Sequence, residues 1–396
     1  MSSKQSHCCN IDIFAGCGGL SLGLHNAGWQ GLFAIEKSPM AFSTLKYNLI
    51  DKKKHFDWPE WLPQAAIDID KAMKKHKVEL SELRGKVDLI AGGPPCQGFS
   101  FAGKRDRNDK RNKLVHSYIR FIKLIEPDLI FFENVVGFNV RMGDHEPYSN
   151  TVEKRIRNLG YHVCKKMVQF KDFGIPQRRE RFILIGSRTE EPTEFFQRLE
   201  ENKRSFLKKH GITKTVSTMA AISDLEMKNG VTDSPDSKGF KAGKYGKART
   251  NYQKLMRNNN GHKIPDSHRF ANHLPTTIER FQYILDNAPK GKMVPKEIKD
   301  MYGLKKMTTR LIDPKAPCPT LTTLPDDYIH YSEPRILTVR EYARIQSFED
   351  GYEFKSKYTT GGNLRLTDVP RYTQIGNAIP PLFMEQVGIV LRRMLQ

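Results

Sequence analysis

Short apolar segments alternate with amphipathic stretches along roughly the first half of the chain. The apolar segments predict strands at Asn10–Phe14, Gly31–Glu36, Lys86–Ala91, Asp128–Glu133, His162–Phe170 and Arg181–Gly186. Between several of them apolar residues recur at helical spacing, as at Leu20, Leu24 and Ala27. Because strands that alternate with helices form βαβ units, we expect an α/β fold with a mostly parallel sheet covered on both faces.

The pattern changes after residue 188. Between residues 189 and 334 the periodicity weakens, and proline, glycine and asparagine become frequent. Helical spacing returns after residue 335, and a last helix is predicted over Pro381–Leu395. We therefore expect the first part of a larger domain at residues 1–188, a smaller, basic and irregular domain at 189–334, and a return to the larger domain at 335–396.

The net charge of the chain indicates which class of molecule it binds. The chain has 396 residues and a formal net charge of +21, with 65 lysines and arginines against 44 acidic residues. Two basic runs without an acidic residue, Lys203–Lys214 and Lys241–Lys263, lie in the irregular region. This excess favours a polyanionic partner, nucleic acid first, over a basic enzyme with a phosphorylated substrate.

Apolar runs and cysteines limit the class of protein further. No stretch approaches the ~18–20 continuous apolar residues of a membrane span, and residues 1–10 lack an apolar signal core. We therefore expect a cytoplasmic protein, neither secreted nor inserted in a membrane. The 6 cysteines are scattered, without a Cys-x-x-Cys pair or the Cys/His spacing of a metal site, which predicts reduced thiols and no metal.

A glycine-rich turn, Asp12–Gly19, leads from the first predicted strand into a helix. Glycines let a backbone pass close to a ligand, and a helix N-terminus favours anionic or polar groups. Glu36 ends the second predicted strand, where a carboxylate can accept both ribose hydroxyls of an adenosine. The dinucleotide pattern G-x-G-x-x-G would need a glycine at the position of Ser21. The turn therefore favours an adenosine-containing cofactor without naming it, and a purely structural turn is the alternative.

A cysteine follows the third predicted strand, in the stretch Gly92–Ser100 (G-G-P-P-C-Q-G-F-S). Glycines and prolines fix a loop at the carboxyl end of that strand, where open α/β sheets bind their ligands. Cys96 in this loop is a candidate nucleophile, with a small buried hydrophobic residue as the alternative. Glu133, at the end of the neighbouring strand, is a candidate acid, with a cap or an ion-pair partner as the alternative.

These segments, taken together, resemble the cytosine-C5 DNA methyltransferases of bacterial restriction–modification type. The residues that carry the resemblance stand in the family's order, at Asp12–Gly19, Gly93–Ser100, Glu133–Gly137, Gln177–Arg181, Arg335–Glu341 and Gln374–Pro381. The resemblance implies the Rossmann-like α/β sheet of methyltransferases that depend on S-adenosylmethionine. It also implies a second, smaller target-recognition domain between Gln177–Arg181 and Arg335–Glu341, which is the basic, irregular region.

The resemblance also implies roles for residues in the reaction. Cys96 would add to C6 of a flipped-out cytosine, Glu133 would bind and protonate N3, and Arg181 with Arg179 would hold O2 or the adjoining phosphate. Phe101–Lys113 matches a loop that closes over DNA in relatives. The residues expected to contact DNA are Gln97, Ser100, Lys104, Arg105 and Thr320.

The cofactor implied is S-adenosylmethionine, without a metal. The residues expected to bind it are Phe14, Ala15, Gly16, Gly18, Gly19, Glu36, Asp68, Ile69, Pro94, Asn377 and Ala378. For Asn377 and Ala378 to reach the cofactor, the last helix must fold back against the first. The expected partners are double-stranded DNA and, in function only, a cognate restriction endonuclease, and the chain is expected to be a monomer.

Three alternatives stay open from the sequence. The same chemistry on transfer RNA is disfavoured because relatives of that type carry Cys-Phe-Thr where this chain has Cys318-Pro319-Thr320. A DNA-binding protein without activity is disfavoured by the presence of Cys96 and Glu133. A dinucleotide oxidoreductase is disfavoured by Ser21 and by the cysteine loop.

Overall fold

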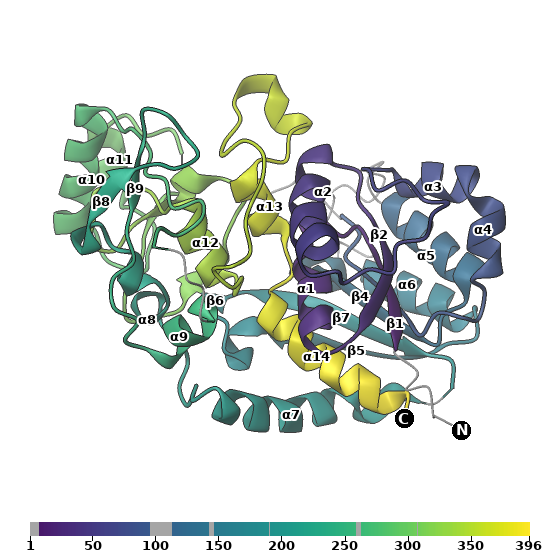
Figure 1. Cartoon of the computed structure of the whole chain (residues 1–396). Coiled ribbons are helices and arrows are strands. Elements are labelled where there is room, and N and C mark those ends of the chain that lie inside the picture. The colour runs from purple at the N-terminus through teal and green to yellow at the C-terminus, as the bar shows by residue number, and fades with distance from the viewer. Residues whose placement is uncertain (1–7, 96–112, 142–145, 190, 259–262, 307) are drawn as a thin grey trace. The chain divides into compact units, whose positions relative to one another are not determined.

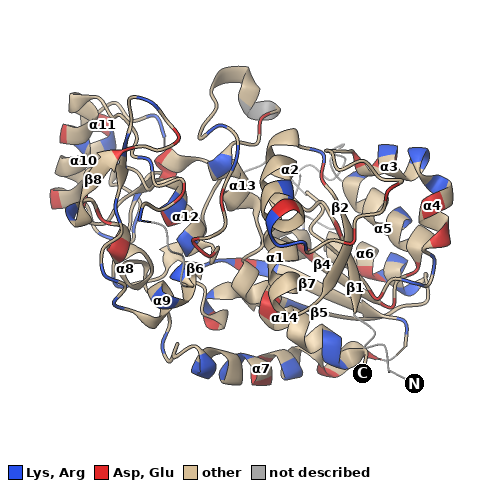
Figure 2. Ribbon diagram, viewed as in Figure 1, with Lys and Arg blue, Asp and Glu red and all other residues tan. Residues whose placement is uncertain are grey.

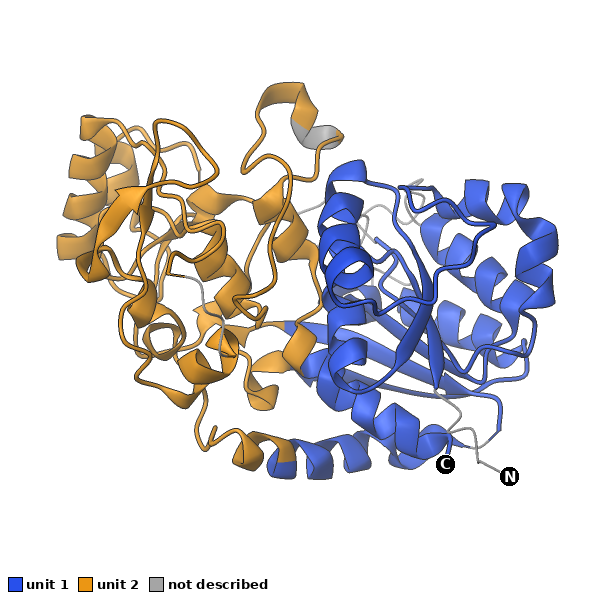
Figure 3. Cartoon of the chain, viewed as in Figure 1, with its two compact units in different colours: residues 1–169, 180–205, 383–396 blue, residues 170–179, 206–382 orange. Residues whose placement is uncertain are grey.

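The structure is a computed structural model that describes residues 8–95, 113–141, 146–189, 191–258, 263–306 and 308–396, with the elements labelled in Figure 1. The chain divides into two compact units, which Figure 3 colours separately. The first unit comprises residues 1–169, 180–205 and 383–396, and the second comprises residues 170–179 and 206–382.

A six-stranded sheet forms the centre of the first unit, in the order β2-β1-β3-β4-β7-β5. The strands are β1 (Cys9–Ile13), β2 (Gln30–Ile35), β3 (Leu89–Gly92), β4 (Leu129–Val135), β5 (His162–Gln169) and β7 (Glu180–Ser187). β1 pairs in parallel with β2 and β3, and β3 pairs in parallel with β4, whereas β7 runs antiparallel to β4 and β5. The predicted mostly parallel α/β sheet is therefore confirmed, with one antiparallel strand within it.

Helices cover this sheet on both sides, as Figure 1 shows. They are α1 (Gly19–Asn26), α2 (Pro39–Leu45), the π-helix η1 (Lys46–Lys52), α3 (Ile69–Lys75), α4 (Lys77–Glu82), α5 (Lys113–Ile125) and α6 (Tyr148–Arg157), and α7 (Phe195–Lys209) begins in this unit. Short 3₁₀ helices lie at Val136–Asn139, after β4, and at Pro192–Glu194, before α7. The side of β1 that carries Ile11 and Ile13 forms one hydrophobic core with α3, α5 and α6. The opposite face of β1 carries the buried polar residues Asn10 and Asp12.

The last helix, α14 (Pro381–Met394), packs against the first helix of the chain. Nε1 of Trp29 donates to the carbonyl oxygen of Gly388 at 2.9 Å, and Nη1 of Arg392 donates to that of Ala27 at 2.9 Å. A Cβ on Gly388 would lie 2.8 Å from Cβ of Ala27, so the two helices approach closely only because this residue is glycine. The chain thus returns to the first unit, as the sequence predicts, but it does so at Phe383.

The second unit consists of short elements, as the weak periodicity of the region predicts. Its strands are β6 (Gln177–Arg178), β8 (Val231–Asp233), β9 (Lys241–Gly243), β10 (Arg310–Leu311), β11 (Cys318–Pro319) and β12 (Tyr328–Ile329). They form two-stranded sheets, β8–β9 antiparallel and β10–β12 and β11–β6 parallel. Its helices are α8 (Thr218–Ile222), α9 (Asn251–Arg257), α10 (Pro275–Asn287), α11 (Lys296–Met301), α12 (Val339–Ile345) and α13 (Arg371–Asn377), and Figure 2 shows lysines and arginines on many of its loops and helices.

Residues 335–382 belong to this second unit and not to the first, which differs from the predicted return at residue 335. The physical reason is that α12 carries arginines that are fully buried among acidic residues of the unit. Arg344 pairs with Asp350 and, at 3.2 Å, with Asp224, and Arg340 pairs with Asp266 at 3.0 Å. In the sequence these arginines look like the solvated face of a helix.

A second buried charge cluster joins Arg335 and Glu341 to two histidines of this unit. Arg335 Nη2 lies 2.7 Å from Glu341 Oε1, and His330 Nε2 lies 3.7 Å from the same oxygen. His268 contacts the Leu225 carbonyl oxygen at 2.7 Å and the Thr338 hydroxyl at 2.8 Å. A neutral ring fits these contacts, because the carbonyl needs an N–H and the hydroxyl can donate to the other nitrogen.

The second unit is therefore expected to lose stability in mild acid. Burial lowers the pKa of His268 to about 4 and that of His330 to about 3, so between pH 6.5 and these values the unfolded chain binds protons that the folded chain does not. Burial opposes the charge of Glu341, but the effect of Arg335 is larger and lowers the pKa of Glu341 to about 2. The stability that ionised Glu341 contributes is therefore lost as the pH falls from about 4.5 toward 2. Thermal unfolding should show a melting temperature at least ~5 °C lower at pH 5 than at pH 7.5.

A matched substitution tests whether these histidines cause that loss. His268→Gln should flatten the dependence of the melting temperature on pH, whereas His162→Gln, at an exposed histidine of the first unit, should not. Equal pH dependence in His268→Gln and the unaltered protein would contradict this assignment.

Candidate functional site

The glycine-rich turn between β1 and α1 has the conformation that its residues predict. Gly16 and Gly18 have φ values of +57° and +88°, which only glycine adopts readily. Phe14 has a φ of +60°, a strained value for a residue with a side chain. A Cβ on Gly16 would meet no atom within 4 Å, so the turn borders open space. The turn is held to β2 by the amide of Ala15, which donates to the Ile35 carbonyl oxygen at 3.1 Å.

Glu36, directly after β2, reaches this turn with its carboxylate. Oε2 accepts from the amide of Gly16 at 2.9 Å, and Oε1 accepts from the amide of Ser38 at 2.6 Å. Burial raises the pKa of Glu36. Each carboxylate oxygen can accept a further hydrogen bond. The predicted neighbours Gly16 and Glu36 are thus in contact, and the carboxylate keeps capacity for hydroxyl groups.

Asp12 and Ser21 form a contact beneath the turn that the sequence analysis missed. Oγ of Ser21 donates to Oδ2 of Asp12 at 2.5 Å, and both residues are fully buried. Burial raises the pKa of Asp12 to about 7. In the sequence Ser21 stands out only as a departure from a glycine pattern, and its hydroxyl early in α1 is the one feature there that could bond an acceptor on β1.

Asp68 and Ile69 lie at the start of α3, next to the end of β2. The amide of Ile67 donates to the Glu36 carbonyl oxygen at 2.7 Å, which ties the two segments together. Asp68 caps α3 by accepting from the amide of Asp70 at 3.0 Å. Ile69 is 2% exposed and belongs to the hydrophobic core, so its side chain does not line an open surface.

A buried ion pair stands at the end of β4. Nε of Arg181 lies 2.9 Å from Oε1 of Glu133, and both side chains are about one-tenth exposed, at 11% and 12%. The antiparallel register of β4 and β7 pairs Val135 with Arg181 and so brings the arginine to the strand end that carries Glu133. Burial lowers the pKa of the Arg181 guanidinium, which still stays charged because an arginine pKa is so high.

The residues directly after β3 lie beside the end of β4. Gly92 pairs with Phe132, the residue before Glu133, so β3 and β4 end side by side. A Cβ on Gly92 would overlap the carbonyl oxygen of Ile13, so glycine is required there. Asn134, which the sequence analysis did not single out, donates from Nδ2 to the carbonyl oxygen of Pro94 at 3.1 Å. Pro94 is buried, and the chain beyond it continues toward Cys96.

Several predicted site residues lie outside the described residues. These are Cys96, Gln97, Ser100, Lys104 and Arg105.

The remaining predicted residues belong to the second unit. Arg179 is buried, with Nη1 3.4 Å from the Leu321 carbonyl oxygen, and the Thr320 hydroxyl donates to the Arg178 carbonyl oxygen at 2.6 Å. Thr320 and Arg179 are therefore neighbours, because β11 pairs with β6.

The segment with Asn377 and Ala378 ends α13 in the same unit. Asn377 is exposed, and the Ala378 carbonyl oxygen accepts from Nε2 of Gln346. A Cβ on Gly376 would overlap the carbonyl oxygen of Thr322, which explains the glycine of this motif by close packing.

Neither a membrane span nor a metal site is found in the part of the chain that the structure describes. Within it no helix is long and apolar enough to cross a membrane. The same residues contain no group of three or more His, Cys, Asp or Glu side chains that could hold a metal ion.

The chain is similar to known proteins along nearly its whole length. The family model for the C-5 cytosine-specific DNA methylase matches residues 9–393. The Type II methyltransferase M.DdeI of Desulfomicrobium norvegicum is 30% identical over 96% of this chain and 87% of its own length. The Type II methyltransferase M.XorII of Xanthomonas oryzae pv. oryzae is 30% identical over 96% of this chain and 83% of its own length.

A solved structure shares the fold along nearly the whole chain. It is a prophage-encoded protein of E. coli described as a DNA modification methyltransferase, with a TM-score of 0.67 and 22% identity over 98% of this chain and 99% of that one. This likeness shows the fold.

Proposed function

Since the chain belongs to the C-5 cytosine-specific DNA methylase family and is a DNA (cytosine-5-)-methyltransferase of restriction–modification type, we propose that it transfers the methyl group of S-adenosylmethionine to C5 of a flipped-out cytosine through a covalent adduct of Cys96 with C6. The observation that carries this mechanism is the buried Glu133–Arg181 pair at 2.9 Å, beside the loop that leads to Cys96.

The thiolate of Cys96 would activate C5 of cytosine for methyl transfer. C5 of cytosine is a poor nucleophile, and a bond from Sγ to C6 moves the π-electron pair of the C5–C6 bond onto C5. C5 can then take a methyl group. Loss of the C5 proton to a base and cleavage of the Sγ–C6 bond restore the aromatic ring and the thiolate. Burial raises the pKa of Cys9, Cys17 and Cys164 to about 12 each, so these thiols are poor alternatives at neutral pH.

Glu133 and Arg181 neutralise the charge that this addition creates. Glu133 would hydrogen-bond N3 of the cytosine, deliver a proton to it as Sγ attacks C6, and take that proton back when the Sγ–C6 bond breaks. Arg181 orients that carboxyl group through Nε, and its Nη1 donates to the Glu180 carbonyl oxygen at 2.7 Å. Arg181 would also donate a hydrogen bond to cytosine O2. Arg179 would contribute from the second unit, at O2 or at the neighbouring phosphate.

The turn between β1 and α1 fits an adenosine cofactor. S-adenosylmethionine would supply an electrophilic methyl group on a sulfonium. Glu36 would accept hydrogen bonds from the ribose hydroxyls, because its bonds to Gly16 and Ser38 leave each carboxylate oxygen able to accept another. The open space at Gly16 would leave room for the cofactor. Phe14, Ala15, Gly18 and Gly19 would line the same site. Asp68, Ile69 and Pro94 would border it, although Ile69 faces the core and would act through its backbone.

DNA would reach this site by base flipping. C5 and C6 of a stacked cytosine are covered by the neighbouring bases, and turning the nucleotide out by ~180° costs a few kcal/mol that protein contacts must offset. Gln97, Ser100, Lys104, Arg105 and Thr320 are proposed for those contacts, and Asn377 and Ala378 for the cofactor side. We further propose a monomer that acts on double-stranded DNA in the cytoplasm, with a restriction endonuclease as its functional counterpart.

Cofactor binding gives a direct prediction. At 100 times its Kd, S-adenosylmethionine should stabilise the protein by ~2.7 kcal/mol and raise the melting temperature by a few degrees, whereas NAD should not. Glu36→Gln removes the carboxylate charge and should reduce this increment to near zero at the same concentration. The measurement is the ligand-induced shift in melting temperature of each variant against its own ligand-free value.

The matched control is Glu60→Gln, which makes the same change at an exposed glutamate. It should keep the full increment. Stabilisation by NAD in place of S-adenosylmethionine would favour a dinucleotide enzyme and contradict the proposal.

A further inference from the structure

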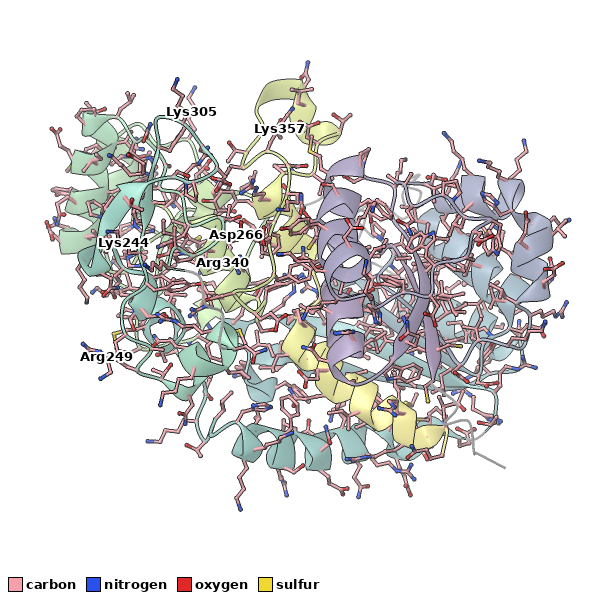
Figure 4. All side chains as sticks on the ribbon, in the orientation of Figure 1. Lys244, Arg249, Asp266, Lys305, Arg340 and Lys357 are labelled. Carbon is pink, nitrogen blue, oxygen red and sulfur yellow. The ribbon has the colours of Figure 1, made fainter. Side chains whose placement is uncertain are left out.

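A polar pocket of about 370 Å³ lies wholly within the second unit, apart from every residue of the proposed mechanism. It is lined by the turn between β8 and β9, by Arg269, by the segment between α12 and α13, and by Arg371 at the start of α13. Figure 4 labels Lys357 on the segment between α12 and α13. The charged residues of its lining are Asp236, Arg269, Lys357 and Arg371.

The one acidic group of this lining is already neutralised. Oδ2 of Asp236 accepts from Nη1 of Arg371 at 2.6 Å and from the Tyr358 hydroxyl at 2.9 Å. Its Oδ1 accepts from the hydroxyls of Ser234 at 3.0 Å and Ser237 at 3.2 Å. These bonds use the lone pairs of Asp236, and Arg371 balances its charge. Arg269 and Lys357 therefore give the pocket an excess of positive charge.

The aromatic ring of the pocket has no face for a nucleobase. The guanidinium carbons of Arg269 and Arg371 lie 3.7 Å and 4.1 Å from the centroid of the Tyr358 ring. Two guanidinium groups this close to one centroid would overlap on a single face, so they cover opposite faces. Stacking of a base, the usual role of an exposed aromatic in nucleic-acid binding, is therefore blocked.

The groups that remain are hydrogen-bond donors. Nη1 of Arg269 is 3.2 Å from the Ser237 hydroxyl, which shows that the guanidinium edge reaches the turn. Lys357 Nζ lies 3.2 Å from Asp368, but its side chain is 56% exposed, and such a surface ion pair contributes little and is readily exchanged. A guanidinium, an ammonium and hydroxyls around one polar pocket match the oxygens of a phosphate.

The backbone around the pocket is held in place before any ligand arrives. Ser267 and Ser356 have φ values of +57° and +77°, in the left-handed region. Both bind Arg371, whose Nη1 donates to the Ser267 hydroxyl at 2.9 Å and whose Nε donates to the Ser356 carbonyl oxygen at 2.9 Å. Strained residues persist where surrounding contacts over-determine them, which is frequent at ligand sites.

We propose that this pocket binds one phosphodiester group of the DNA backbone, through Lys357 and Arg269. The inference rests on the proposed function, since it assumes DNA as the ligand. In this proposal the β8–β9 turn and the segment between α12 and α13 bind the DNA backbone and fix the position of the duplex, without contacting bases.

The test compares DNA binding of single-charge variants over a range of salt concentrations. Lys357→Gln should weaken binding about tenfold at low salt, equally for a methylatable duplex and an unrelated one, and should reduce the slope of log K against log salt by about 0.9, the value for one phosphate contact. Lys357→Arg should keep the slope of the unaltered protein. Thr359→Val, which removes a hydroxyl of the lining, should weaken binding about threefold without changing the slope.

Lys75→Gln, at an exposed lysine of α3 in the first unit, is the matched control and should keep the slope. A slope for Lys357→Gln equal to that control would overturn the inference, and so would a change in discrimination between the two duplexes, which would indicate a base contact. Inorganic phosphate at constant ionic strength tests for a free anion as the ligand. Saturable binding of phosphate that Lys357→Gln abolishes, with an unchanged DNA slope, would overturn the assignment to DNA. Failure of the unaltered protein to bind DNA at all would instead reject the proposed function.

Discussion

Replacing Cys96 by serine is expected to abolish methyl transfer and leave DNA binding intact. A serine hydroxyl at neutral pH is far less nucleophilic than a thiolate, so addition to C6 should fail and turnover should fall by ~10³-fold or more. The measurement is transfer of a labelled methyl group to DNA, with the Kd for the same DNA determined in parallel.

The matched control for this prediction is Cys164→Ser. Cys164 lies half-buried on β5, and burial raises its pKa to about 12, so the same substitution there should keep activity. DNA with 5-fluorocytosine adds a second readout. Fluorine cannot leave C5 as the proton does, so the unaltered protein should accumulate a covalent complex, and Cys96→Ser should form none. Appreciable turnover by Cys96→Ser would remove this residue from the mechanism.

Replacing Glu133 by glutamine should lower kcat by ~10²–10⁴-fold, the range for loss of a positioned general acid. The glutamine amide can still bond the cytosine ring but cannot deliver a proton to N3. The change also leaves the buried guanidinium of Arg181 without its counter-charge at 2.9 Å, so the melting temperature should fall as well. Single-turnover methyl transfer and thermal unfolding measure the two effects separately.

Glu153→Gln provides the control, because Glu153 also pairs with an arginine, Arg157, at 3.1 Å in the same unit. It should lose some stability and keep kcat. If Glu133→Gln lost stability alone, with kcat within twofold of the unaltered protein, Glu133 would be an ion-pair partner of Arg181 and not the acid.

Much of the first unit could be predicted because β1, β3 and β4 are largely buried on both faces and stand out as apolar runs. Glu36 is an example: its position after such a run places it at the carboxyl end of β2, and the structure shows its bond to Gly16. Contacts between side chains were harder to predict. The bonds of Ser21 to Asp12 and of Asn134 to Pro94 depend on which neighbours the sheet brings together, and spacing in one sequence does not reveal them.

The second unit was predicted less well, for an electrostatic reason. A helix with arginines usually faces water, so α12 gave no sign that Arg340 and Arg344 are fully buried. Their partners Asp224 and Asp266 come from distant parts of the chain, whereas Asp350 follows α12 closely. The pairing of these charges is what assigns residues 335–382 to the second unit, and only the folded structure shows it.

The central claim is that this chain methylates C5 of cytosine within a short DNA sequence, with S-adenosylmethionine as the donor. Its most direct test is transfer of a labelled methyl group from S-adenosylmethionine to mixed genomic DNA, followed by bisulfite sequencing of the product. We expect incorporation of label and protected cytosines at one short motif. No incorporation by a folded protein with S-adenosylmethionine bound would contradict it.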